Sequence, residues 1–79
     1  MVKVRLWSGE ELTLHARRVE EVLKCLRTLR SELKDLINEN GTPTALLLVF
    51  VNGKELSVLE GLEVGEEDLV ELLPVLHRG

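Results

Sequence analysis

The sequence predicts an α+β protein with the element order ββαββ, in which one long helix packs across one face of a mixed sheet. Two observations support this fold class, and the length of the chain sets the number of domains. Short apolar segments bounded by turn signals lie near both ends of the chain, and the apolar repeat between them changes to a helical period. The length of 79 residues is enough for one domain. We therefore expect a single domain over residues 1–79 that ends in a short tail, residues 74–79.

The first 15 residues read as a β-hairpin. Apolar and polar residues alternate over residues 2–7, which predicts a strand with one apolar face. Ser8-Gly9-Glu10 supplies turn residues, and the alternation resumes over residues 11–15. Two strands joined by a short turn should pair antiparallel.

From about residue 18 to residue 39, apolar side chains recur at helical spacing and predict one long helix. A good N-cap residue is missing, so the sequence locates the start of the helix only to within several residues. Asn40-Gly41 is a helix stop signal, and Pro43 prevents continuation. The stripe that should face the sheet consists of Val19, Val22, Leu23, Leu26, Leu29, Leu33, Leu36 and Ile37.

The remaining strands follow the helix. Residues 46–51 are apolar at every position and too few for a helix, so we expect a strand buried on both faces. Asn52-Gly53 is a strong hairpin signal that leads into a strand over residues 54–58. Residues 68–73 form the last strand, and we expect its pairing to stop at Pro74, which has no N–H group. This order of elements is the β-grasp, or ubiquitin-like, arrangement.

One helix leaves the second face of the sheet open, so half of the apolar residues in 46–51 should be exposed. The set on the open face is either Leu46, Leu48 and Phe50 or Leu47, Val49 and Val51. We take Leu47, Val49 and Leu73 as the sheet-face residues that bind a partner, because an exposed apolar patch marks an interaction site. Cover by Trp7 and a homodimer are the alternatives.

Composition narrows the class of protein. A single cysteine, Cys25, excludes an internal disulfide and favours the reducing cytoplasm. No stretch approaches the roughly 20 apolar residues that span a bilayer, so we expect no membrane partner. Residues 1–34 carry a formal charge of +3 and residues 35–79 one of −7, giving −4 in total. The acidic half is either solvated surface or a surface for a basic partner. Without an aromatic platform, nucleic acid is disfavoured.

No enzymatic chemistry is evident in the sequence. His15 and His77 lack metal-ligand spacing, so we expect no metal site. No nucleophile or acid–base group stands out as catalytic, and Cys25 fits a half-buried packing position better than a nucleophile. A glycine-rich phosphate loop is also missing, so we expect no bound cofactor. Gly79 is the exception, because a residue without a Cβ can enter a narrow enzyme channel and present its carboxylate.

The chain resembles the MoaD/ThiS family of sulfur-carrier proteins over nearly its whole length, and two segments carry the resemblance. Residues 49–55, Val-Phe-Val-Asn-Gly-Lys-Glu, are similar to the family's "hydrophobic-x-VNG" hairpin. Residues 65–75, Gly-Glu-Glu-Asp-Leu-Val-Glu-Leu-Leu-Pro-Val, resemble its "G-D-x-V-x-hydrophobic-hydrophobic-P-P-V" ending, with one proline instead of two. The order and spacing of the two segments make the combination more specific than either alone.

The resemblance implies a function for the tail. In the family, a ubiquitin-activating-type enzyme uses ATP to adenylate the terminal glycine, here Gly79. The glycine then becomes a thiocarboxylate that donates sulfur in molybdopterin, thiamin or thiolated-tRNA synthesis, and some relatives are conjugated to lysines. The expected partners are this adenylating enzyme and a sulfur-accepting synthase subunit. The tail residues expected to contact them are Pro74, Val75, Leu76, His77 and Arg78.

One residue departs from the family pattern. The family ends in Gly-Gly, whereas this sequence ends in Arg78-Gly79. Three readings stay open: the Arg78 side chain blocks activation, the partner has a wider channel with an acidic wall, or the chain has lost activation and acts as an interaction module or protein modifier.

Overall fold

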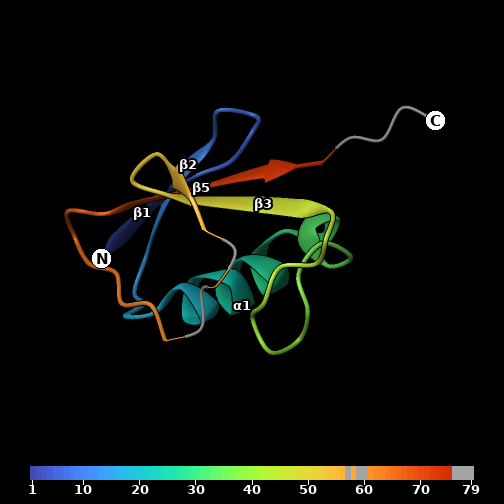
Figure 1. Ribbon diagram of the computed structural model, residues 1–79, viewed down its shortest axis with the longest axis horizontal. Coiled ribbons are helices and arrows are strands. Elements are labelled where there is room, and N and C mark those ends of the chain that lie inside the picture. The colour runs from blue at the N-terminus through green and yellow to red at the C-terminus, as the bar shows by residue number, and fades with distance from the viewer. Residues whose placement is uncertain (57, 59–60, 76–79) are drawn as a thin grey trace.

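The computed structural model describes residues 1–56, 58 and 61–75. The elements are β1 (Val2–Arg5), β2 (Glu11–Leu14), α1 (Val19–Leu29), the 3₁₀ turn η1 (Ser31–Leu33), β3 (Leu47–Val51), β4 (Lys54–Glu55) and β5 (Leu69–Pro74). The five strands form one sheet in the order β2-β1-β5-β3-β4, with α1 across one face (Figure 1). β1 and β5 are parallel and all other neighbours antiparallel. This arrangement confirms the predicted β-grasp fold.

The predicted first hairpin is present. β1 and β2 pair in a register that sets Val2 opposite Leu14. At the turn, the Leu6 N–H donates to the Glu10 carbonyl at 2.9 Å, and Gly9 has a φ of +94°. An L side chain rarely adopts that φ, so glycine is the residue suited to this position.

α1 starts without a capping hydroxyl or carboxylate at its N-cap position, as the sequence predicts. Glu21, in the first turn, reaches back instead. One of its carboxylate oxygens accepts the N–H of Arg17 at 2.8 Å and that of Arg18 at 3.1 Å. These bonds stabilise the charged form and lower the pKa of Glu21. A glutamate three residues into the helix was therefore the available start signal.

The prediction that the helix continues to residue 39 is wrong. α1 ends at Leu29, and Arg30 adopts an extended conformation with φ −130° and ψ 110°. The chain then makes η1 and further isolated turns, in which Leu33 accepts the Ile37 N–H at 3.1 Å. Turns with i→i+3 and i→i+4 bonds keep apolar residues at helix-like spacing. Leu33 and Ile37 thus reach the core from outside α1.

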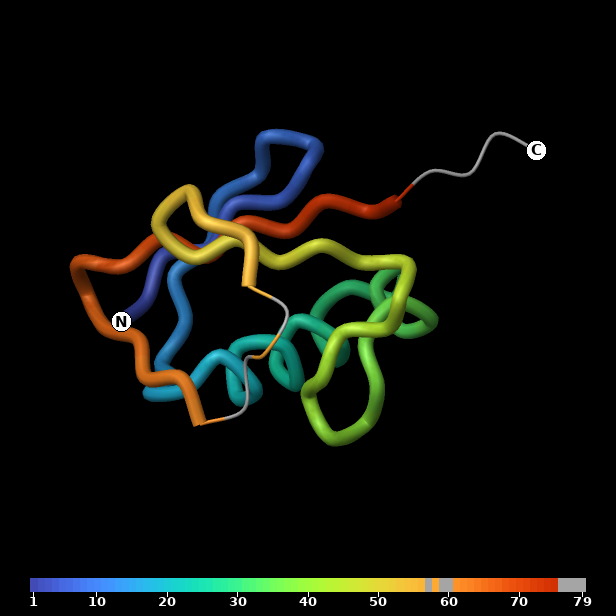
Figure 2. The backbone as a smooth tube through the Cα atoms, viewed as in Figure 1, coloured from blue at the N-terminus to red at the C-terminus, as the bar shows by residue number. Residues whose placement is uncertain are grey.

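The loop that follows packs back against α1. Figure 2 shows the chain after α1 turning back before it enters β3. Gly41 is buried with a φ of +86°, and an added Cβ would overlap the Glu20 carbonyl oxygen. Gly41 is therefore a packing position between loop and helix, not the residue that ends the helix.

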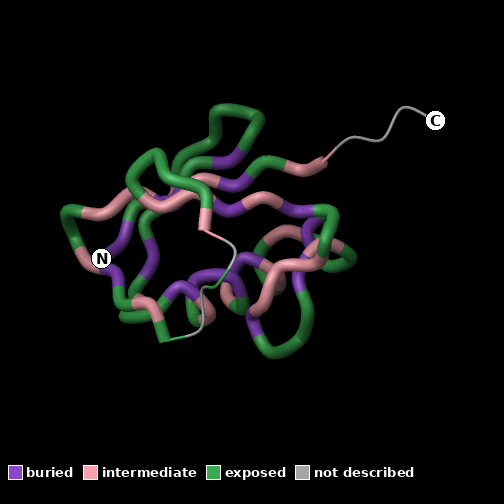
Figure 3. Tube along the Cα trace, viewed as in Figure 1, coloured by how far each residue is buried: buried purple, intermediate pink, exposed green. Residues whose placement is uncertain are grey.

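The core lies between α1 and the sheet. Alternate residues of β1, β3 and β5 face it, including Val4, Val49, Val70 and Leu72. In β3, Leu47 and Val49 are buried and the other three residues are half-buried (Figure 3). The prediction that this strand is buried on both faces is wrong, because α1 covers one face only.

The expectation that pairing stops at Pro74 is also wrong. Pro74 lies opposite Leu47, and the Val75 N–H donates to the Leu46 carbonyl at 2.8 Å. In an antiparallel pair, hydrogen-bonded and non-hydrogen-bonded positions alternate. Pro74 occupies a non-hydrogen-bonded position, so its missing N–H costs the β3–β5 ladder nothing. On its other side, β1 has already ended.

The two segments that carried the family resemblance meet in one hydrogen-bonded lock. Asn52 and Gly53 both have positive φ, 54° and 82°, as a tight hairpin requires. The Asn52 side chain donates to Asp68 and accepts the Leu69 N–H, both at 2.9 Å. Asp68 also accepts the Gly65 N–H at 2.7 Å. The bonds from Asn52 and Gly65 lower the pKa of Asp68.

The strand predicted over residues 54–58 is shorter, since β4 has only two residues.

Candidate functional site

A row of charged residues crosses the open face of the sheet, opposite α1. Arg5 on β1 lies between Glu11 on β2 and Glu71 on β5. Phe50 on β3 continues the row, with Glu71 opposite it on one side and Glu55 of β4 on the other. Residues directly opposite on neighbouring strands share a face, so all five lie on the open face.

An apolar patch lies beside this row, toward the end of β5. Leu48 lies opposite Leu73, and Trp7, which follows β1, lines the same hollow as Leu73. Leu73 is 46% exposed, Leu46 45% and Trp7 44%. We refer to Trp7, Leu46, Leu48 and Leu73 as the apolar patch. Large apolar side chains gathered on one face indicate a protein-binding surface.

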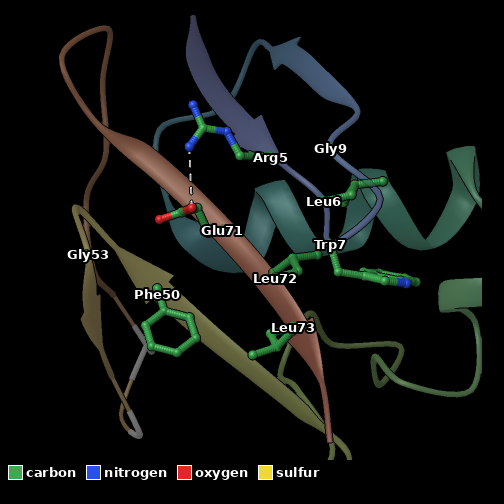
Figure 4. A pocket seen from close by; sticks show the side chains of 9 residues that line it. All are labelled: Arg5, Leu6, Trp7, Gly9, Phe50, Gly53, Glu71, Leu72 and Leu73. Carbon is green, nitrogen blue, oxygen red and sulfur yellow. Dashed lines mark ion pairs between the residues drawn. The ribbon is translucent and has the colours of Figure 1, made fainter. Parts of the chain in front are cut away.

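Part of the row and part of the apolar patch line one groove of about 400 Å³. Figure 4 shows Phe50 and Leu73 on neighbouring strands, with Trp7 beyond Leu73 and the Arg5–Glu71 ion pair at the other end. The residues that line the groove are Arg5, Leu6, Trp7, Gly9, Phe50, Gly53, Glu71, Leu72 and Leu73. The groove therefore has an apolar end and a charged end.

The charged end is organised by Arg5. Its guanidinium donates to one carboxylate oxygen of Glu11 through Nε at 3.0 Å and Nη2 at 2.8 Å. Its Nη1 lies 3.5 Å from Glu71. The hydrogen bond with Glu11 is the main cause that raises the pKa of Arg5. Arg5 is thus bound chiefly by Glu11. The Glu71 carboxylate can still accept hydrogen bonds from a group in the groove.

The structure corrects two of the predicted sheet-face residues. Leu47 is 4% exposed and Val49 1%, because both point toward α1. Leu73 does lie on the open face, with Leu48 as its neighbour. Glu71 was the signal for this parity, since a charged residue in the last strand should face solvent and sets Leu73 on the same side. The sequence-based prediction put the wrong set of β3 residues on the open face. It therefore missed four site residues: Arg5, Phe50, Glu55 and Glu71.

The predicted tail lies only partly within the described residues. Pro74 ends β5, and Val75 is hydrogen-bonded to Leu46 of the apolar patch. Leu76, His77, Arg78 and Gly79 lie outside the described residues. The last described residue is therefore fixed next to the apolar end of the groove.

The other candidate residues stay apart from this site. Cys25 is half-buried and packs against the core, as predicted, and His15 is exposed. Among residues 1–56, 58 and 61–75, no three His, Cys, Asp or Glu side chains lie close enough together to hold a metal ion. In the same residues, no helix has the length and apolar character needed to cross a membrane.

Comparison with known proteins finds similarity in structure only. No family model matches the sequence, and no curated protein matches it. Urm1 from Sulfolobus solfataricus superposes with a TM-score of 0.72 at 21% identity, over 92% of this chain and 99% of that one. A chain of the BexX/CysO complex from Amycolatopsis orientalis gives a TM-score of 0.72 at 20% identity, with both chains covered completely. SAMP1 from Haloferax volcanii gives 0.71 at 17% identity, over 99% and 98%.

These neighbours are ubiquitin-like β-grasp sulfur carriers of the MoaD/ThiS type. They cover nearly the full length of the chain, so the predicted resemblance is confirmed at the level of the fold. At such identities the likeness establishes the fold and leaves the activity to be argued from the site.

Proposed function

We propose that this protein is a sulfur carrier whose Gly79 carboxylate is activated by a partner enzyme. The observation that carries the proposal is the position of Val75. It ties the end of β5 to Leu46 at the edge of the apolar patch, and four residues, the last of them Gly79, follow it in the sequence. A partner bound to the patch would therefore be close to the start of the tail.

The chemistry requires little of the carrier. The Gly79 carboxylate attacks the α-phosphate of ATP on the partner, pyrophosphate leaves, and an acyl-adenylate forms. Sulfide (HS⁻) from a donor then attacks the carbonyl carbon, AMP leaves, and a thiocarboxylate remains. ATP and the catalytic groups belong to a ubiquitin-activating-type enzyme, and the carrier supplies a docking face and a slim carboxylate.

The product would serve a sulfur-accepting synthase subunit in the cytoplasm. Molybdopterin, thiamin and thiolated-tRNA synthesis are the candidate pathways that the family resemblance suggests. Support comes from the fold shared with Urm1, CysO and SAMP1 and from the lock between the Asn52 hairpin and Asp68. For the related CysO, the solved structure is a complex with BexX.

The test is intact-mass spectrometry after incubation with an activating-type enzyme from the same source, ATP and a sulfur donor. We expect an ATP-dependent gain that corresponds to one oxygen replaced by sulfur, localised to Gly79. A chain that lacks Gly79 should show no gain, and Glu39→Gln, an exposed change on the helix side, should react like the wild type.

Absence of both the AMP adduct and the sulfur gain, with a known carrier modified in parallel, would contradict the proposal. Arg78 is the specific observation behind the alternative, a ubiquitin-like interaction module or modifier that has lost Gly-Gly activation. Such a module would tolerate loss of Gly79 and would lose its partner when Leu73 becomes charged.

A further inference from the structure

The open face is acidic around Phe50, at one end of the groove. Counting Glu11, Arg5, Glu71 and Glu55, the charged row holds three carboxylates and one guanidinium, a formal charge of −2. Arg5 and Glu71 line the groove, whereas Glu11 and Glu55 flank it, and Lys3 lies on the same face outside this row. Arg5 is occupied by Glu11 through two short hydrogen bonds. The charge left for a partner is therefore negative, and it lies on the Glu71 and Glu55 side.

Phe50 lies between these two carboxylates. It pairs with Glu71 on β5 and with Glu55 on β4, and its ring lines the groove (Figure 4). An aromatic face attracts cations through its quadrupole, and flanking carboxylates add direct ion pairing. Glu55 forms no ion pair with any residue in the described ranges. The site has the chemistry to receive one basic side chain.

The other end of the groove differs in kind. Leu73 and Trp7 offer exposed apolar surface and no charge. A single partner that filled the whole groove would need an apolar side chain at this end and a basic one at the Phe50 end. Charge complementarity distinguishes such a partner from one that presents apolar residues alone.

We propose that the open-face groove docks a protein surface that presents a lysine or arginine beside an apolar side chain, with the basic group seated on Phe50 between Glu71 and Glu55. The inference rests on the proposed carrier function, because the occupant is taken to be the activating enzyme. Glu71 and Glu55 then act as specificity determinants and make no contact with the reacting carboxylate.

The test is calorimetric titration of the carrier with the activating-type enzyme from the same source, paired with the AMP-adduct assay. Glu71→Gln keeps the side-chain shape and removes the charge, and Glu55→Gln does the same on β4. Glu39→Gln is the matched control for net charge. Phe50→Leu keeps an apolar residue and removes the ring. The indole N–H signal of Trp7, the single tryptophan, shows that each variant is folded.

We expect Kd to rise about fivefold for Glu71→Gln and about threefold for Phe50→Leu, with Glu55→Gln between them and Glu39→Gln unchanged. The effects of the two glutamates should shrink when NaCl is raised from about 50 mM to about 500 mM. The maximal rate of AMP-adduct formation should stay the same, because the changes affect docking only.

Several results would overturn the inference. Glu71→Gln and Glu55→Gln could bind as tightly as Glu39→Gln, or more tightly, which would indicate an acidic partner facing Arg5. The chain alone could form a dimer that Glu71→Gln dissociates, which would identify a second copy as the occupant. Wild-type binding with these charge effects but without an AMP adduct would contradict the carrier function and leave the docking inference standing. No binding at all would reject both.

Discussion

On the face of the sheet that α1 covers, Val4, Val49 and Val70 are almost completely buried, whereas on the open face Trp7 and Leu73 expose nearly half of their surface. The two faces are built from the same strands, often from adjacent residues. The buried side chains of the covered face are all aliphatic, whereas the open face adds two aromatic rings, Trp7 and Phe50, and several charged side chains. Apolar side chains in this protein therefore serve both core stability and partner binding, and the alternation of side chains along each strand separates the two roles.

A charge at two adjacent positions of β5 should affect the two faces very differently. Leu72→Asp places a carboxylate in the core and should cost more than about 4 kcal/mol, enough to unfold so small a domain. Leu73→Asp should change stability by only about 0.5 kcal/mol and abolish enzyme binding. Circular dichroism with chemical denaturation measures the first effect and calorimetric titration the second. Equal stability of the two variants would contradict the assignment of faces.

A second prediction concerns the covered side, where the loop packs on α1. Gly41→Ala combines an unfavourable φ with overlap at the Glu20 carbonyl, and we expect a loss of about 3 kcal/mol. Gly53→Ala is the matched control, because its φ of 82° is similar and no atom lies within 4 Å of an added Cβ. Its cost should be about 1 kcal/mol. Urea denaturation compares the two, and similar losses would mean that the close contact with α1 is not energetically important.

The smallest expected effect concerns the lock between the Asn52 hairpin and β5. Hydrogen bonds from Asn52 and Gly65 lower the pKa of Asp68 in the folded state. The stability from this group is therefore fully present above the unfolded pKa of about 3.9 and is lost as pH falls through the lower folded value. Asp68→Asn should be slightly less stable near neutrality and should lose less stability than the wild type between about pH 4 and pH 2.

The measurement for this lock is the urea midpoint as a function of pH. Glu10 and Glu21 also have lowered pKa values, so the variant should keep part of the acid dependence. Identical acid profiles for variant and wild type would show that the lock does not contribute to stability. An unchanged open face is expected in both, because Asp68 lies outside the groove.

Much of the fold follows from local signals in the sequence. The first hairpin is identified by the alternation over residues 2–7, the second by the Asn52-Gly53 turn, and α1 by the helical stripe near Val22. Each of these signals acts over a few neighbouring residues. The same local alternation places Arg5 on the face opposite Val4. For the site, the sequence supplied Leu73 and the expectation of an apolar open face.

Tertiary structure decided two features that local sequence patterns leave open, namely which face of β3 is covered and where the helix ends. Leu47 and Leu48 are equally apolar, and only pairing with β5, where Leu48 meets Leu73 and Phe50 meets Glu71, sets which of them α1 covers. The helix ends at Leu29 although apolar spacing continues, because turns held by long-range packing present Leu33 to the core equally well. Parity and helix length depend on contacts between residues far apart in the chain, and a local pattern does not contain them.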